Sequence, residues 1–313
     1  MAISFPTLAD RAYRDGDADM RRLHHLLAES HRLTGRWRAW TPDRIDGFLR
    51  RCWSDEGRPA ILDQIHIWEA PDGSIVGAVH PEDPDEAWIE IHPSWLHLVP
   101  DLLAWAEGQH LARHAGEDPM PPLFTYHSAG DDVRRAVLEE RGYAERRPVE
   151  VLRRRSVPNE PEPPVLPAGY RLVWPEVTNA HDRSELTAIT QLVFGVHFSD
   201  RAMLLEERWM TPHARIAAET PDGTYAAWCG VWAAPELGAG FFEPVGTHPD
   251  HRRRGLATAV MLEGLRWMRD RGIRYAHVGT GATMDANRLY AGLGFRIFET
   301  SHQWAWQGPR DPS

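Results

Sequence analysis

Three consecutive arginines, Arg252, Arg253 and Arg254, stand directly before Gly255 in the stretch THPDHRRRGLATA. A glycine after a predicted strand lets the backbone approach a bulky anion, because it has no side chain in the way. The residues that follow are predicted to begin a helix, whose first N–H groups and dipole favour a pyrophosphate. Arginine side chains can add bidentate, charge-assisted bonds to it. The stretch therefore predicts a phosphate-binding turn; a basic helix start in solvent is the alternative.

The spacing of this turn differs from that of the common phosphate-binding loops. Neither the glycine and lysine spacing of a Walker loop nor the GxGxxG of a Rossmann turn is present. A formal net charge of -10 over 313 residues also argues against nucleic acid as a partner, because duplex binding normally needs a broad positive surface. We therefore expect a pyrophosphate at this turn and no nucleic-acid partner.

A second motif follows one predicted strand later, in the sequence NRLYAGLGF at 287–295. Together the two stretches resemble the GNAT N-acetyltransferase superfamily, whose motif joins an (Arg/Gln)-x-x-Gly-x-(Gly/Ala) loop to a later helix ending Leu-Tyr-x-x-x-Gly-Phe. Arg252, Gly255 and Ala257 occupy the loop positions, and Tyr290 occupies the tyrosine position. The resemblance covers the whole second half of the chain, in the order of its elements as well as in its motifs.

The resemblance implies acetyl-CoA as co-substrate, with its pyrophosphate on the amides of the loop. Its pantetheine arm would lie like an added strand beside the strand that precedes the loop. Pro244 interrupts that strand, and because a bulge tolerates proline, a bulge is expected to separate it from the next strand. The residues expected to bind the co-substrate are Val245, Gly246, Thr247, Arg252, Arg253, Arg254, Gly255, Leu256, Ala257, Thr258 and Asn287.

Two side chains are candidates for the proton transfers of amine acetylation, the reaction that the resemblance implies. An alkyl ammonium, with a pKa of about 10, must lose a proton before it can attack. Glu243 stands where many GNAT enzymes place a carboxylate base, but an ordinary glutamate is too weak to deprotonate an ammonium, so burial or a water relay must help. Tyr290 would face the departing sulfur as the acid. A surface glutamate and a packed aromatic ring are the alternatives.

The elements that must position these residues form two similar halves. The stretch 156–169, SVPNEPEPPVLPAG, is so rich in proline that it predicts a semi-rigid spacer. On each side of it the pattern gives helices, a hairpin turning at Pro-Asp-Gly, a strand, a long helix, a strand, a helix and a closing strand region. We predict an α/β fold of two tandem GNAT-like domains, each a mixed, mainly antiparallel sheet flanked by helices. The domains are 1–155 and 170–313, with 156–169 as the linker.

The first half lacks the residues of the phosphate-binding turn. Alignment of the halves puts Leu96, Val99 and Asp101 at the loop positions and Leu138 at the tyrosine position. The loop thus loses its glycine and its arginine and gains a carboxylate where an anion would bind. We expect 1–155 to be a degenerate copy without a co-substrate, and 170–313 to be the catalytic domain.

Other reactive side chains give weaker signals. His110 and His114 share a predicted helix face, but no carboxylate or third ligand follows at metal spacing, so an exposed face and no bound metal are expected. His24 and His25 are interpreted in the same way. Cys229 lies in a predicted buried strand and is expected to act as a small apolar core residue.

The cellular setting is predicted from simple patterns. The two cysteines lie far apart, which argues against a disulfide framework and fits a reducing compartment. The first residues lack the pattern of a signal peptide, and no apolar run approaches the length of a membrane span. We therefore expect a cytoplasmic protein with no membrane partner. Nothing in the sequence indicates an oligomeric state.

The expected function is acetyl-CoA-dependent N-acetylation of a small-molecule primary amine, because the acidic balance favours a cationic acceptor. Phe194, Phe198 and Trp209 lie at the acceptor entrance that the resemblance implies and could stack on a substrate or on the other domain. A protein N-terminus or a lysine is the alternative acceptor. The alternative from another class is a non-catalytic acyl-CoA sensor or interaction module, although a sensor would need the loop without Glu243 and Tyr290.

Overall fold

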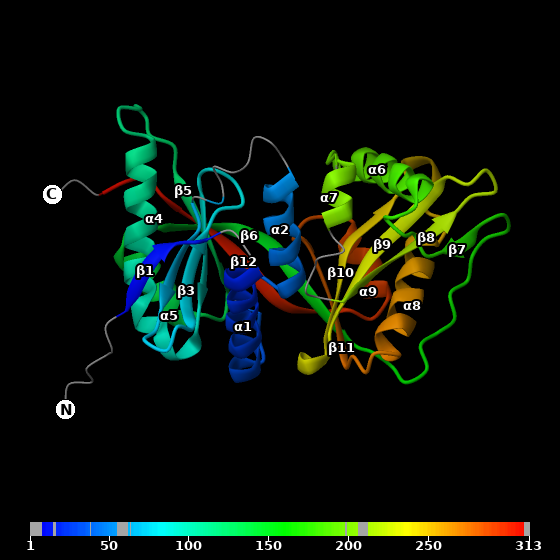
Figure 1. Ribbon diagram of the computed structural model, residues 1–313, viewed down its shortest axis with the longest axis horizontal. Coiled ribbons are helices and arrows are strands. Elements are labelled where there is room, and N and C mark those ends of the chain that lie inside the picture. Colours follow the sequence, from blue (N-terminus) through cyan, green and yellow to red (C-terminus); the bar gives the residue numbers. More distant parts are fainter. Residues whose placement is uncertain are drawn as a thin grey trace. The chain divides into compact units, whose positions relative to one another are not determined.

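The structure is a computed structural model that describes residues 8–14, 17–37, 39–54, 62, 64–197, 199–205 and 212–309. The chain divides into two compact units, whose elements are labelled in Figure 1. Unit 1 consists of Met1–Cys52, Glu56–Val151 and Glu299–Ser313, and unit 2 consists of Trp53–Asp55 and Leu152–Phe298. Among the described helices, none is both long enough and apolar enough to cross a membrane.

Unit 1 contains a mixed sheet with strand order β1-β2-β3-β4-β5-β12. Its strands are β1 (Ala9–Ala12), β2 (His66–Glu69), β3 (Ile75–His80), β4 (Glu86–Ile91), β5 (Leu123–Ser128) and the second part of β12 (Arg296–Trp306). Neighbouring strands are antiparallel except β4 and β5, which are parallel. Its helices are α1 (Asp17–Thr34), α2 (Pro42–Ser54), the 3-10 helix η1 (Pro93–Leu98), α4 (Val99–Arg113) and α5 (Asp132–Glu140).

Unit 2 contains a sheet with strand order β7-β8-β9-β10-β11-β6. Its strands are β7 (Arg171–Val173), β8 (His213–Glu219), β9 (Tyr225–Ala234), β10 (Ala239–Thr247), β11 (Tyr275–Gly281) and the last part of β6 (Ala144–Ser156). Its helices are α6 (Ala180–Phe194), α7 (Asp200–Leu205), η3 (Pro235–Leu237), η4 (Pro249–His251), α8 (Leu256–Arg269) and α9 (Ala286–Gly292). As in unit 1, the fourth strand pairs in parallel with the fifth, here β10 with β11, and the first four strands pair with one another in antiparallel order.

The two units repeat one topology. The order β1-β2-β3-β4-β5 in unit 1 corresponds to β7-β8-β9-β10-β11 in unit 2, with the same strand directions. In each unit a long helix follows the fourth strand, α4 in unit 1 and α8 in unit 2. The predicted α/β fold with a mixed, mainly antiparallel sheet in each half is confirmed, and so is the internal repeat.

Two long strands contribute residues to both units. In β6, residues 144–151 belong to unit 1 and residues 152–156 to unit 2; in β12, residues 296–298 belong to unit 2 and the rest to unit 1. The sequence division places all of 170–313 in the second domain, whereas packing places 299–313 in unit 1. The reason is a distant pairing, since Ser301–Trp306 pairs with β5. The sequence pattern gives two closing strands near the C-terminus, at 295–299 and 303–307, whereas the structure has one continuous strand there, Arg296–Trp306.

The sheet of unit 2 is covered on both faces. Because side chains alternate along a strand, Ile216 and Cys229 lie in one buried cluster with α8, whereas Ala217 and Trp228 lie in another with α6. Figure 1 shows these helices around β8, β9 and β10. Cys229 is fully buried, as predicted, and burial raises the pKa of its thiol. The middle strands β9 and β10 therefore form a rigid support for the residues at their ends.

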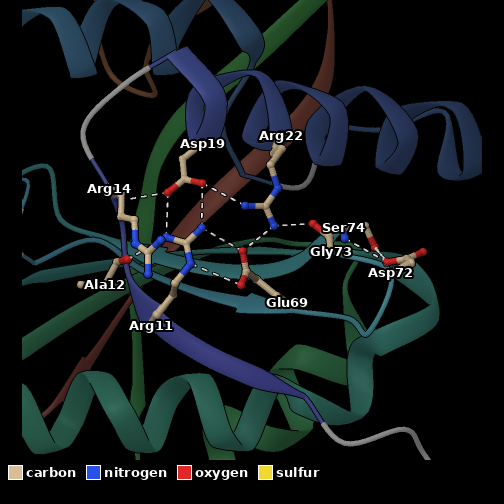
Figure 2. Close-up of polar contacts among 9 residues, drawn as sticks. All are labelled: Arg11, Ala12, Arg14, Asp19, Arg22, Glu69, Asp72, Gly73 and Ser74. Carbon is tan, nitrogen blue, oxygen red and sulfur yellow. Dashed lines mark hydrogen bonds and ion pairs between the residues drawn. The ribbon is translucent and has the colours of Figure 1, made fainter.

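The short strand β1 in unit 1 has the polar sequence ADRA, and the sequence does not predict it. Figure 2 shows the ion network beside it. Arg11 Nη2 lies 2.8 Å from Oδ1 of Asp19 and 2.8 Å from Oε1 of Glu69, and Arg22 Nη1 lies 2.9 Å from Asp19. Burial raises the pKa of Asp19, but the hydrogen bonds from Arg11 and the Arg14 backbone N–H outweigh it and lower the pKa. The network ties β1 to α1 and β2.

Replacing Arg11 by Met should lower the free energy of unfolding by about 1–3 kcal/mol, because the buried Asp19 carboxylate loses a main hydrogen-bond donor. Since the pKa of Asp19 is lowered in the folded state, the network stabilises the fold fully above about pH 4 and less as the pH falls further. Urea unfolding should therefore show a larger effect at about pH 7 than at about pH 3. Arg14→Met is the control, because only its backbone bonds to Asp19. An equal loss in both variants would contradict the assignment.

Candidate active site

The strand β10 is interrupted by a bulge at Pro244. Its pairing with β9 shifts in register between Phe242 and Val245. Its parallel pairing with β11 covers only Ala239–Phe242 and ends at the pair of Phe242 with Val278. The two strands are therefore unpaired beyond the bulge, so the bulge and the separation predicted from Pro244 are confirmed.

Two residues of β9 that the sequence analysis did not single out hold this bulge in place. Trp232 Nε1 donates a hydrogen bond of 2.8 Å to the backbone carbonyl of Glu243. A Cβ atom on Gly230 would lie only 2.2 Å from the same carbonyl oxygen, so a larger residue would displace the bulge. An isolated glycine inside a strand often marks the close approach of another backbone. Gly230 was therefore the residue from which the contact of β9 with the bulge could have been predicted.

The backbone from Val245 to Thr247 has one paired edge and one open edge. These residues pair with β9, whereas the register with β11 has already ended at Phe242. An extended ligand can add to such an edge as a further strand. A Cβ atom on Gly246 would lie 3.1 Å from ring carbons of Phe194, which is 41% exposed. Phe194 thus lies against this part of β10, and Phe198 and Trp209 lie outside the described residues.

The loop before α8 contains two residues in the left-handed conformation. Gly255 has φ 81° and Arg253 has φ 62°, and Arg253 is the one non-glycine residue with positive φ in the described part of the chain. This conformation costs an L-residue roughly 1–2 kcal/mol, and alternating conformations turn successive N–H groups to one side as an anion-binding nest. Gly255 is the N-cap of α8 and provides no side-chain cap. The first N–H groups of α8 are therefore available to a ligand.

The three arginine side chains of the loop are exposed. Arg252 Nε donates to the carbonyl of Thr247 at 3.4 Å, and Arg254 Nη1 donates to the hydroxyl of Tyr170 at 3.0 Å. His248 caps the short helix η4 before the loop, since its side chain accepts from the backbone N–H of Asp250. The loop therefore presents three positive charges around the nest.

The side chain of Glu243 on β10 acts electrostatically on the phenol of Tyr290. Tyr290 lies on α9 and is only 4% exposed, in the buried cluster that contains Phe295. Burial, and then the negative charge of Glu243, raises the pKa of the Tyr290 phenol. Glu243 itself is exposed on the bulge. The phenol therefore stays protonated at neutral pH and can act as a hydrogen-bond donor.

Asn287 makes its side-chain bonds within unit 2. Its Nδ2 donates to the carbonyls of Gly281 and Met284 at 3.0 and 3.1 Å, and its Oδ1 accepts from Arg153 Nε at 2.9 Å. Arg153 also donates to the carbonyl of Phe295 at 3.2 Å. These bonds order the turn before α9 and thereby position Tyr290. The contact between Asn287 and the co-substrate stays a prediction.

The corresponding turn of unit 1 has a different geometry. Leu98 and Val99 have φ values of -84° and -51°, so the backbone there is right-handed and forms no nest. Pro100 follows in the first turn of α4 and has no N–H to offer. Leu138, at the tyrosine position, is fully buried in the core. This geometry is consistent with the expected degenerate copy.

The amino-acid sequence is similar to those of known acetyltransferases. Residues 178–295 match the acetyltransferase (GNAT) family. A mycothiol acetyltransferase from Nocardiopsis dassonvillei is 28% identical over 294 residues, which cover 82% of this chain and 84% of that protein. One from Kineococcus radiotolerans is 36% identical over 154 residues, 47% of this chain and 49% of that protein. The alignment thus spans about half the length of this second relative.

Solved structures show a similar fold. A GCN5-related N-acetyltransferase from Sphaerobacter thermophilus has a TM-score of 0.61 and 20% sequence identity, with 99% of both chains covered. A tandem GNAT protein from the clavulanic acid biosynthesis pathway has a TM-score of 0.66 and 17% identity, with 97% of this chain and 100% of that chain covered. At these identities the likeness concerns the fold, and it includes a protein with two GNAT domains.

Proposed function

We propose that this chain, whose residues 178–295 match the acetyltransferase (GNAT) family, transfers the acetyl group of acetyl-CoA to a primary amine of a small molecule. The observation that carries this proposal is the open strand edge at the end of β10, which leads into the left-handed loop with its arginines. The electrostatic effect of Glu243 on the phenol of Tyr290 supports it.

The loop and the open strand edge would bind different parts of the co-substrate. The N–H groups from Arg252 to Thr258 would hold the pyrophosphate, where the nest and the dipole of α8 favour negative charge. The arginine side chains would add charge-assisted hydrogen bonds. The backbone of Val245, Gly246 and Thr247 would bond the extended pantetheine arm as a neighbouring strand does. The thioester would then lie near the bulge.

The reaction follows from what the residues at the bulge can do. The amine nitrogen forms a bond to the thioester carbonyl carbon, the C–S bond breaks, and the sulfur leaves as a thiolate. The thiolate then takes up the second proton, which the nitrogen loses as the amide forms. Glu243, through water, would take the proton that the ammonium must lose. Tyr290 would donate a hydrogen bond to the sulfur as negative charge develops there. Because the pKa of Tyr290 is raised, a strengthened hydrogen bond is favoured over complete proton transfer.

The relatives narrow the choice of acceptor to test first. Those compared above are named mycothiol acetyltransferases, so we propose mycothiol-type amines, followed by polyamines and aminoglycosides, as acceptors. Release of CoA thiol in the presence of this panel tests the proposal. A rise with at least one amine supports an enzyme. If acetyl-CoA binds but no small amine, peptide N-terminus or lysine peptide releases CoA, the sensor function is favoured instead.

Replacing Tyr290 by Phe should lower kcat by less than about a hundredfold and leave acetyl-CoA affinity nearly unchanged, because one hydrogen bond to the leaving group is lost. Steady-state kinetics and calorimetry measure the two effects. Tyr275→Phe, at a tyrosine that is 39% exposed, is the matched control. An unchanged kcat, with the chemical step shown to limit the rate, would remove Tyr290 from the mechanism.

A further inference from the structure

Unit 1 contains a cluster of three potential metal ligands, Asp85, His110 and His114. Asp85 directly precedes β4, His110 lies in the last turn of α4, and His114 is its C-cap. One ligand atom from each residue lies within 4.8 Å of the others. His114 Nε2 is 2.7 Å and His110 Nδ1 is 3.6 Å from the same oxygen, Oδ1 of Asp85. The expected exposed histidine face is therefore wrong for His110, which is 1% exposed.

The hydrogen bond of His110 leaves a lone pair directed at the cluster. Its Nε2 lies 2.8 Å from the carbonyl oxygen of Pro121, which can only accept, so Nε2 carries the hydrogen. In the neutral ring Nδ1 then has a free lone pair. This atom is buried and has no hydrogen-bond partner among the described residues. A buried lone pair and a carboxylate oxygen thus face each other, and a cation between them would satisfy both.

The second nitrogen of His114 also lies near an oxygen. Its Nδ1 is 3.1 Å from Oε1 of Glu117, an ion-pair distance without hydrogen-bond geometry, while its Nε2 faces Asp85. Each imidazole therefore has an oxygen beside the nitrogen that does not face the other two ligands. Histidines that bind metals almost always have such an oxygen partner, which fixes the orientation of the ring.

We propose that Asp85, His110 and His114 bind a divalent transition-metal ion of the zinc class, with water in the remaining position. Two imidazoles and one carboxylate are a donor set typical of zinc, whereas magnesium and calcium prefer oxygen ligands alone. Arg113 is the nearest competing cation, with Nη1 at 3.9 Å from Asp85, but it also donates to Pro84 and Gln64. The ion would tie the end of α4 to the segment before β4.

Calorimetry of the tag-free, full-length protein with zinc chloride, after treatment with a chelator, tests this site. One ion should bind per chain, and Asp85→Asn and His114→Ala should each weaken binding by at least about tenfold. His25→Ala, at a side chain that is 65% exposed on α1, should leave binding unchanged. Cobalt in place of zinc should give absorption bands in the visible range with the wild type and weaker bands with both variants.

Thermal melts test zinc binding by a second measurement, and the folding of each variant is checked separately. Zinc should raise the melting temperature of the wild type, since a ligand stabilises the state that binds it, and should do so much less for Asp85→Asn. Circular dichroism shows whether each variant is folded, and Asp85→Asn is chosen because it keeps the shape of a partly exposed side chain. No stoichiometric binding by the wild type, or equal binding by a folded double variant of Asp85 and His114, would overturn the proposal and leave a proton shared between His114 and Asp85.

Discussion

Replacing Gly255 by Asp should weaken acetyl-CoA binding by more than about a hundredfold, because a like-charge contact costs several kcal/mol and each 1.4 kcal/mol is about tenfold. The new carboxylate would stand at the N-cap of α8, beside the N–H groups proposed to hold the pyrophosphate. A Cβ atom at Gly255 would meet no protein atom within 4 Å. The protein itself therefore has room for the side chain, so a loss of binding beyond that caused by backbone strain at φ 81° reports on the ligand.

Two matched variants separate charge from backbone strain. Gly272→Asp places the same residue at another left-handed glycine, with φ 71° and nothing within 4 Å, just after the C-terminal end of α8. It should bind acetyl-CoA like the wild type. Gly255→Ala adds strain without charge and should have an intermediate effect. Calorimetry measures all three affinities and the stoichiometry of the wild type, which should be one per chain. Wild-type binding by Gly255→Asp would remove the loop from the site.

The number of acetyl-CoA molecules bound per chain tests whether unit 1 also binds the co-substrate. The turn there has right-handed backbone at Leu98 and Val99, and for this reason we expect no co-substrate in that unit. A second binding event of similar affinity would show that a GNAT fold can hold acetyl-CoA without a nest. The stoichiometry therefore tests the degenerate copy independently of the Gly255 variants.

The residues found from the sequence are those whose role depends on local backbone. Gly255 must adopt a left-handed conformation and Pro244 must interrupt a strand, and both requirements are visible in a few neighbouring residues. The alternation of apolar residues placed nearly all the strands and helices for the same reason. Tyr290 was predicted from the motif shared with GNAT proteins; its raised pKa keeps the phenol protonated, and its role as a donor stays a prediction.

The residues that sequence reasoning missed depend on contacts between distant segments. Asp85 reaches His110 and His114 from another loop, so no spacing along the helix could reveal it. The pairing of β12 with β5 joins residues far apart in the sequence. β1 is polar, and the ion network of Arg11, rather than an apolar pattern, holds it beside β2. Periodicity carries no information on such contacts.

Replacing Glu243 by Gln should lower kcat/KM by about a hundredfold or more at neutral pH, since a positioned base contributes about 10²–10⁴-fold. The change should leave the fold intact, because the bulge is held by the backbone carbonyl of Glu243, which accepts from Trp232, and not by its side chain. Acetyl-CoA affinity should therefore be unchanged. Glu236→Gln, at an exposed glutamate in η3, is the matched control and should have wild-type activity.

The dependence of this defect on pH identifies the step that Glu243 assists. Below its pKa of about 10, the fraction of an alkyl amine that is unprotonated rises about tenfold for each pH unit. Without the base, the variant can use only acceptor molecules that are already unprotonated. Its kcat/KM should therefore rise with pH and approach that of the wild type at alkaline pH. An acceptor whose amine has a lower pKa should reduce the defect at neutral pH in the same way. A defect that is equal at every pH and for every acceptor would show that Glu243 positions the substrate and does not remove its proton.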